Sequence, residues 1–170
     1  MKNRYNVALL PITQNDNVIN LAKKFSAISD CYLLGDGSLP HITLCQFTAE
    51  DSTINSIWES ICACDIEKKL YLTFETFSFV TFDDCTFWVS LLPDNCDKLI
   101  KMHSIIKDIV KNELTKAYDP HMTLANSKNR EYKNFSDSIC KQYATIRDEF
   151  ILSLGKSDLI GQYTEIVFSV

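Results

Sequence analysis

Two five-residue segments of this chain, PHITL at 40–44 and PHMTL at 120–124, carry the same residue types in the same order. The whole sequence has only 3 His and 4 Pro, and two of each lie in these segments. Histidine is the side chain whose ordinary pKa lies nearest to neutral pH, so it exchanges protons readily under physiological conditions. Two histidines brought into one site can act as general base and general acid in a single reaction.

Strand geometry separates each segment into a polar face and an apolar face. Residues i and i+2 of a β-strand point the same way, about 6.5 Å apart. His41 and Thr43 therefore share one face, and His121 and Thr123 share the corresponding face of the second segment. The opposite faces carry residues suited to a core: Ile42, Leu44, Met122 and Leu124. The next positions on the polar faces are Cys45 and Ala125, which are small enough to leave room for a ligand.

Two imidazoles and two hydroxyls that converge on one point would suit in-line attack at phosphorus. One histidine would deprotonate the nucleophile, the other would protonate the leaving oxygen, and the hydroxyls would hydrogen bond the phosphoryl oxygens. This chemistry needs no metal and no cofactor. Two histidines without Asp, Glu or Cys at ligand spacing also make a poor zinc site, so we expect no metal.

The elements around the two segments repeat in the same order. A strand, a helix and a strand bearing the motif are predicted at 4–12, 16–28 and 40–47, and again at 85–92, 95–114 and 120–126. This repeat indicates a duplication, in which a pseudo-twofold axis would bring the two motifs together. The remaining predicted elements are a helix at 52–64, a strand at 69–82 with a one-residue bulge after Phe74, a polar, partly helical stretch at 129–145, and closing strands at 149–157 and 164–170.

The paired His-x-Thr motifs, the order of the elements and the chain length together resemble the 2H phosphoesterase superfamily, which includes 2′-5′ RNA ligase-like proteins and cyclic phosphodiesterases. The resemblance covers nearly the whole chain. It implies a single bilobal domain over 1–170 with an α+β fold, in which each lobe is an antiparallel sheet with helices on its outer face and the active site lies in the groove between lobes. It also implies that His41 and His121 are the acid/base pair and that Thr43 and Thr123 hold the phosphate.

The chain departs from the family after the second motif, where many relatives have Arg and this sequence has Asn126. Lys128 and Arg130 follow soon after and could hold other phosphates of the substrate, although solvated loop charges are an equal alternative.

Two aromatic residues are further candidates for substrate binding. Trp88 could stack on a nucleobase in the groove or pack against a neighbouring helix. The resemblance suggests that Tyr163 lies near the groove, while an ordinary tyrosine at a strand edge is the simpler reading. His103 has no partner motif and is expected to be structural.

Charge and cysteine content restrict the partners and the compartment. The net charge of −5, from 17 basic and 22 acidic residues, does not favour a grip on long nucleic acid, so a small nucleotide or short oligonucleotide is the expected partner. Seven scattered Cys indicate reduced thiols in the cytoplasm. We see no signal peptide or membrane span, and we expect a monomer.

The leading hypothesis is therefore a metal-independent phosphodiesterase acting on 2′,3′-cyclic phosphates or 2′-5′ linkages of RNA-derived nucleotides. Hydrolysis of cyclic di- or oligonucleotide signals, as in some phage members of the superfamily, would use the same residues. A nucleotide- or RNA-binding module with little turnover is the alternative from another class. The family also allows RNA ligation as the reverse reaction, for which the sequence offers no support of its own.

Overall fold

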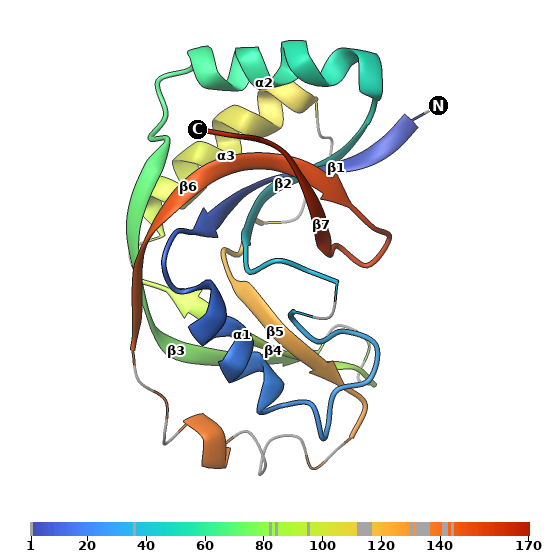
Figure 1. Ribbon diagram of the computed structural model, residues 1–170, viewed down its shortest axis with the longest axis vertical. Coiled ribbons are helices and arrows are strands. Elements are labelled where there is room, and N and C mark those ends of the chain that lie inside the picture. Colours follow the sequence, from blue (N-terminus) through green and yellow to red (C-terminus); the bar gives the residue numbers. More distant parts are fainter. Residues whose placement is uncertain are drawn as a thin grey trace.

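Seven antiparallel strands form one sheet in a computed structural model, which describes residues 2–35, 37–81, 83, 85–94, 96–111, 117–129, 131, 137–140, 143 and 145–170 (Figure 1). The strands are β1 (Lys2–Pro11), β2 (Ile42–Glu50), β3 (Lys69–Thr81), β4 (Phe87–Pro93), β5 (Met122–Ser127), β6 (Ile146–Ser157) and β7 (Tyr163–Ser169). The sheet order is β2-β1-β6-β3-β4-β5, with β7 paired to β6 outside this path. All seven strands expected from the sequence are confirmed, as is the α+β class.

The long strand β6 joins two halves of the sheet. Its residues 150–156 pair with β1, and its residues 146–151 pair with β3. Beyond β3, residues 153–157 of β6 pair with β7. One half is therefore β2-β1-β6-β7 and the other is β5-β4-β3-β6, which matches the duplication indicated by the sequence. The two strands that carry the motifs, β2 and β5, are the first and last strands of this order, and they contact each other because the sheet curls.

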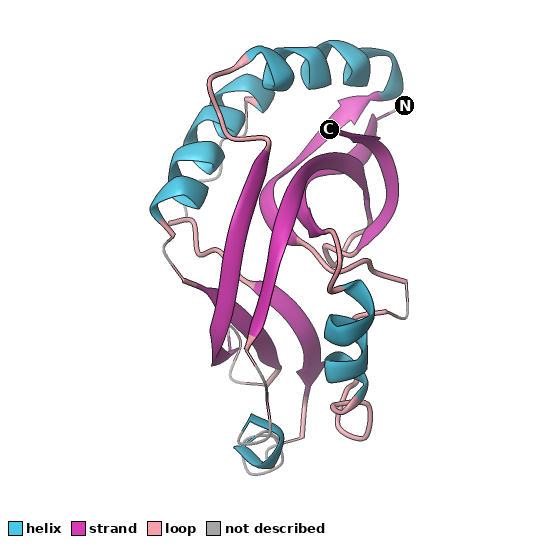
Figure 2. Ribbon diagram, turned by 60° about the vertical axis from the view of Figure 1, so that its left-hand side comes forward, coloured by secondary structure: helices cyan, strands magenta, loops and turns pink. Residues whose placement is uncertain are grey.

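In each repeat, the helix that lies between the two strands packs on the half of the sheet that contains the other repeat. The helices are α1 (Asn15–Lys23), α2 (Ile54–Ala63) and α3 (Asp97–Val110), and a 3₁₀ turn (Asp51–Thr53) precedes α2. The helix α1 follows β1 but contacts β5, whereas α3 follows β4 but contacts β2. Figures 1 and 2 accordingly place α2 and α3 at one end of the molecule and α1 at the other. This exchange ties the two halves together.

The helices end earlier than the sequence suggested. The helix α1 stops at Lys23, and turns continue to residue 28. The helix α3 ends at Val110, where Lys111 adopts a left-handed conformation (φ 53°) that terminates helices. The expected end of that helix at 112–114 lies outside the described residues. In the stretch 129–145, residues 137–140 are helical and many of the others lie outside the described residues.

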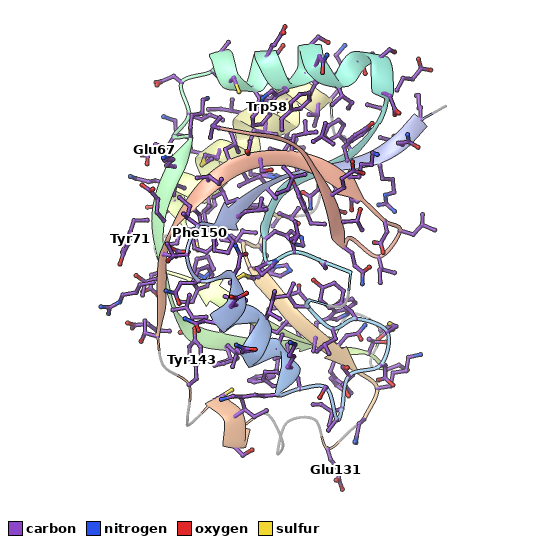
Figure 3. All side chains as sticks on the ribbon, viewed as in Figure 1. Trp58, Glu67, Tyr71, Glu131, Tyr143 and Phe150 are labelled. Atoms are coloured by element: carbon purple, nitrogen blue, oxygen red, sulfur yellow. The ribbon has the colours of Figure 1, made fainter. Side chains whose placement is uncertain are left out.

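The apolar interior is continuous across both halves of the sheet. Phe150 of β6 is fully buried and packs against Phe74 with ring centroids 5.6 Å apart, whereas Tyr71 projects outward from β3 (Figure 3). Trp58 of α2 stacks on Phe168 of β7 at 5.9 Å. Within the described ranges, no helix is long and apolar enough to span a membrane.

Both motif strands contain one extra residue at the same position of the motif. Thr43 pairs with Ala8 and Cys45 with Val7, so Leu44 has no partner in β1. In β5 the extra residue is Leu124, because its neighbours on either side pair with consecutive residues of β4. An extra residue moves all later side chains to the other face of the strand.

These bulges correct the expectation that Cys45 and Ala125 face the groove. Both residues are buried in the core instead, and Gln46 takes the position beside the ligand site. The bulge expected in β3 is confirmed, since Phe74 pairs with Pro93 and Thr76 with Leu92. Alternation of apolar residues made the β3 bulge visible in the sequence, but Leu44 and Cys45 are both apolar and gave no such signal.

Candidate active site

The two edge strands enclose a pocket with a volume of about 230 Å³ that both motifs line. His41 and Thr43 reach it from the start of β2, and His121 and Thr123 reach it from the start of β5. The structure thus brings the four residues predicted from the motifs to one place. Their apolar neighbours in the motifs are fully buried on the other side of each strand, as expected: Ile42, Leu44, Met122 and Leu124.

The two imidazoles are held by identical local hydrogen bonds. His41 Nδ1 donates to the carbonyl of Leu39 and His121 Nδ1 donates to the carbonyl of Asp119, each at 2.7 Å. A carbonyl oxygen only accepts, so Nδ1 carries the proton in each ring and Nε2 is left to exchange protons with a ligand. The residue between is Pro in both motifs, and proline restricts the residue before it to extended conformations. This accounts for the proline in the repeated pattern.

The surroundings of the two histidines differ although their motifs match. His41 is only 7% exposed, and its ring lies 5.4 Å from the Tyr163 ring. Burial, and to a smaller extent the nearby His121, lower the pKa of His41 to about 4, although the bond to Leu39 opposes the shift. The side chain of His121 is 41% exposed, and a carboxylate oxygen of Asp119 lies 4.0 Å from its Nδ1. The site therefore has one neutral, buried imidazole and one exposed imidazole beside a carboxylate.

Asn6 fixes the hydroxyl of Thr43. Its Nδ2 donates to Thr43 Oγ1 at 3.0 Å, which leaves the hydroxyl proton of Thr43 free to be donated into the pocket. Asn6 is fully buried, and its Oδ1 has no hydrogen-bond partner in the described part of the chain. We did not identify Asn6 from the sequence, although a buried-strand pattern such as RYNVALLPI with one Asn inside it was the available signal.

His103 and Tyr118 hold the bulge of β2 from outside the pocket. His103 Nδ1 donates to the carbonyl of Leu44 at 2.6 Å, and the Tyr118 hydroxyl donates to the carbonyl of Thr43 at 2.8 Å. The two rings stack at 4.2 Å. His103 thus has the packing role expected of it. Tyr118 was not predicted, and it connects the first motif to the segment that leads into the second.

The four remaining candidates have different positions. Trp88 of β4 lines the pocket, with its ring 5.9 Å from that of Tyr32. Tyr163 does not line the pocket itself, but its ring lies behind His41, with the two ring centroids 5.4 Å apart. Lys128 is exposed away from the pocket, and its backbone N–H donates to the Asp30 carboxylate. Arg130 lies outside the described residues.

Tyr163 is buried because the neighbouring strand has no side chain to keep its ring out. The Tyr163 hydroxyl lies 2.7 Å from Ser153 Oγ in a buried hydrogen bond. A Cβ atom on Gly155 would lie only 2.4 Å from the Tyr163 ring. The ring therefore fits over Gly155 and supports His41 from behind.

Comparison with known proteins identifies the family. The family model of the 2′-5′ RNA ligase superfamily matches residues 29–150. The chain belongs to this superfamily. The 2H phosphoesterase resemblance read from the paired motifs is thereby confirmed. No curated protein matches the chain.

Solved structures share the fold of this superfamily member at low sequence identity. Escherichia coli LigT complexed with 3′-AMP aligns with a TM-score of 0.64 and 11% identity, covering 100% of this chain and 96% of LigT. Kluyveromyces marxianus Usb1 aligns at 0.54 and 11%, covering 98% of this chain and 95% of Usb1. The MHV ns2 PDE domain aligns at 0.55 and 14%, covering 90% of this chain and 99% of that domain.

Asn126, two residues after the second motif, has a structural role in this superfamily member. Its Oδ1 accepts hydrogen bonds from the backbone N–H groups of Cys31 (3.1 Å) and Tyr32 (2.9 Å), and its own backbone bonds to Asp30 and Tyr32. The segment 30–34 is thereby fixed along the open edge of β5, with Tyr32 lining the pocket. Among the described residues, no cluster of three or more His, Cys, Asp and Glu could hold a metal ion.

We expect Asn126→Ala to lower the free energy of unfolding by about 2–4 kcal/mol, because two backbone N–H groups would lose their acceptor. Urea unfolding at neutral pH measures this. The exposed Asn55→Ala on α2 is the control and should change stability by less than about 0.5 kcal/mol. Equal effects of both substitutions would contradict the role of Asn126.

We also expect acid to destabilise the protein through His41. The pKa of His41 falls from 6.5 to about 4 on folding, so the native state disfavours its protonation. Its contribution to stability is complete above pH 6.5 and is lost as the pH falls toward 4, amounting to about 2–3 kcal/mol. Urea unfolding at pH 7.5 and pH 4.5 should show a smaller loss for His41→Gln than for the wild type. An equal loss in both proteins would refute the burial argument.

Proposed function

We propose that this protein is a metal-independent phosphodiesterase that hydrolyses 2′,3′-cyclic phosphate or 2′-5′ phosphodiester bonds of RNA-derived nucleotides. The observation that carries the proposal is the convergence of two imidazoles and two threonine hydroxyls on one pocket from equivalent positions of β2 and β5. Membership of the 2′-5′ RNA ligase superfamily supports phosphoester chemistry in general. The donors and acceptors in the pocket support this reaction class.

The two histidines have separate roles in the proposed mechanism. His41 is neutral and takes a proton from the attacking water through Nε2. The new P–O bond forms as the bond to the leaving oxygen breaks, and His121, beside the Asp119 carboxylate, donates its proton to that oxygen. Thr43 and Thr123 donate hydrogen bonds to the non-bridging phosphoryl oxygens. The two motifs are too alike for the sequence to assign the base and the acid. The deeper burial of His41 favours His41 as the base and His121 as the acid.

The proposed substrate is a small nucleotide or a short oligonucleotide. Trp88 and Tyr32 give one wall of the pocket aromatic surface on which a base could stack. The similar fold of LigT has been captured with 3′-AMP, which supports a nucleotide of this size. The net charge of −5 also favours a small substrate. Lys128 has no part in the proposal because it lies away from the pocket.

Substitution of either histidine should abolish most of the activity. In acid–base catalysis each proton transfer contributes about 10²–10⁴-fold, so His41→Ala and His121→Ala should each lower kcat/KM by at least 10²-fold. The double variant should be far less than multiplicatively worse, because both residues act in one transition state. Thr43→Ala and Thr123→Ala should cost about 1–3 kcal/mol each. EDTA should leave activity unchanged.

The assay uses 2′,3′-cyclic mononucleotides, 2′-5′ oligoadenylate and cyclic dinucleotides under chelator. Loss of activity in EDTA with rescue by a divalent ion would exclude the metal-free mechanism. Turnover of cyclic dinucleotides alone would support an enzyme that hydrolyses cyclic dinucleotide signals instead. Binding without turnover of any substrate would support a binding module.

The pH profile of kcat/KM should be a bell with an unusually acidic lower limb. Activity requires neutral His41, whose pKa is about 4, so the lower limb should lie about two pH units below that of an unburied imidazole. A lower limb near pH 6.5 would show that His41 is not the base.

A further inference from the structure

Three hydroxyl side chains lie side by side across β3, β4 and β5 on the floor of the pocket. Ser78 pairs directly with Ser90, and Ser90 pairs directly with Thr123. Directly paired residues point to the same face of a sheet, and all three line the pocket. Neighbouring strands are about 4.8 Å apart, so this hydroxyl row extends about 10 Å from Ser78 to Thr123.

The hydroxyl row has no protein partner in the part of the chain that the structure describes. None of its three hydroxyls forms a hydrogen bond with another described residue, although Ser90 is only 3% exposed. Ser90 Oγ is not among the fully buried atoms that lack a partner in the described residues, so it keeps access to the pocket. Because Ser90 faces the pocket, a ligand there can supply a hydrogen bond.

The corresponding row in the other half of the sheet consists of Thr43, Ala8 and Ser153 and is closed to a ligand at Ala8 and Ser153. The Ser153 hydroxyl is buried and already hydrogen bonded to the Tyr163 hydroxyl and the Phe168 carbonyl. Ala8 pairs with Thr43 as Ser90 pairs with Thr123. Ala8 is fully buried in a cluster with Leu10 and Tyr163. Polar surface open to a ligand is therefore concentrated on the half that also carries the exposed His121.

We propose that the hydroxyl row binds the phosphate and sugar oxygens of a ribonucleotide. This rests on the proposed function and adds two binding residues to its site. Ser90, beside Thr123, donates to the same phosphate group. Ser78, one strand further away, hydrogen bonds an oxygen of the attached sugar.

The next pair along the same strands fits the rest of a nucleotide. Val80 pairs with Trp88, and both line the pocket about 6.7 Å from the hydroxyl row, two residues along each strand. These side chains offer an apolar and aromatic surface for the base. The floor of the pocket thus changes from hydroxyls to apolar groups over roughly the length of a nucleotide.

Binding of 3′-AMP and of inorganic phosphate, measured by calorimetry, tests the assignment without depending on turnover. A hydrogen bond to a charged phosphate is worth more than one to a sugar hydroxyl. Ser90→Ala should therefore weaken both ligands about tenfold. Ser78→Ala should weaken 3′-AMP about threefold to tenfold and phosphate less than about twofold. Ser78→Thr keeps the hydroxyl and should retain affinity for 3′-AMP.

Thr76→Val is the matched control, because it removes an exposed hydroxyl from β3 two residues before Ser78 and outside the pocket. It should leave both affinities unchanged. Thermal melts of all variants show whether each remains folded. Equal affinities of wild type, Ser78→Ala and Ser90→Ala for 3′-AMP would overturn the assignment, and so would an absence of binding to the wild type.

The assignment and the proposed function can fail separately. If the wild type turns over substrate while both serine variants bind 3′-AMP normally, the binding role of the hydroxyl row is wrong and the proposed phosphodiesterase activity is retained. If the serine variants bind more weakly but the wild type turns over no phosphodiester, the hydroxyl row stands as a nucleotide site and the proposed enzyme is wrong.

Discussion

Edge strands present backbone groups that no neighbouring strand can satisfy, and here the edge strands β2 and β5 carry the candidate active site. Each edge is covered in its own way. In β2, side chains of His103 and Tyr118 donate to two consecutive carbonyls around the bulge. In β5, the backbone of segment 30–34 satisfies the edge groups, and the Leu34 N–H donates to the carbonyl of Leu124 at 2.8 Å.

These caps also explain how two edges can meet without pairing to each other. Tyr118 comes from the segment just before the second motif but bonds the first motif. Segment 30–34 comes from the loop before the first motif but bonds the strand of the second. Each motif is therefore anchored by the chain that leads into the other, and the helices α1 and α3 repeat this exchange on a larger scale. The pocket remains open because backbone groups on its rim are satisfied elsewhere.

The two motifs have the same residue pattern, but the side chains around them differ. His41 is enclosed by Tyr163, which itself depends on the missing side chain of Gly155. His121 has no comparable cover and lies beside Asp119. Thr43 is oriented by a hydrogen bond from Asn6. Thr123 instead lies beside Ser90 and Ser78 on the neighbouring strands. A proton acceptor and a proton donor require such a difference, because identical surroundings would favour the same protonation state in both rings.

The sequence by itself determined the elements and the four central residues of the site. Alternation of apolar and polar residues predicted the strands, and the repeated PHxTL pattern selected His41, Thr43, His121 and Thr123, because strand periodicity alone decides which side chains share a face. The bulge in β3 was also readable, since it shifts the apolar face of a long strand.

Only the tertiary structure decided what surrounds those residues. The bulges at Leu44 and Leu124 were hidden because apolar residues follow on both faces, so Cys45 was assigned to the wrong side. Asn6, Tyr118 and Asn126 act through contacts with residues far away in the chain, and no local pattern encodes such contacts. Tyr163 was placed near the groove, but its burial depends on Gly155 in the facing strand. Burial of His41, and with it the difference between the two histidines, arises from packing between elements that the motifs do not contain.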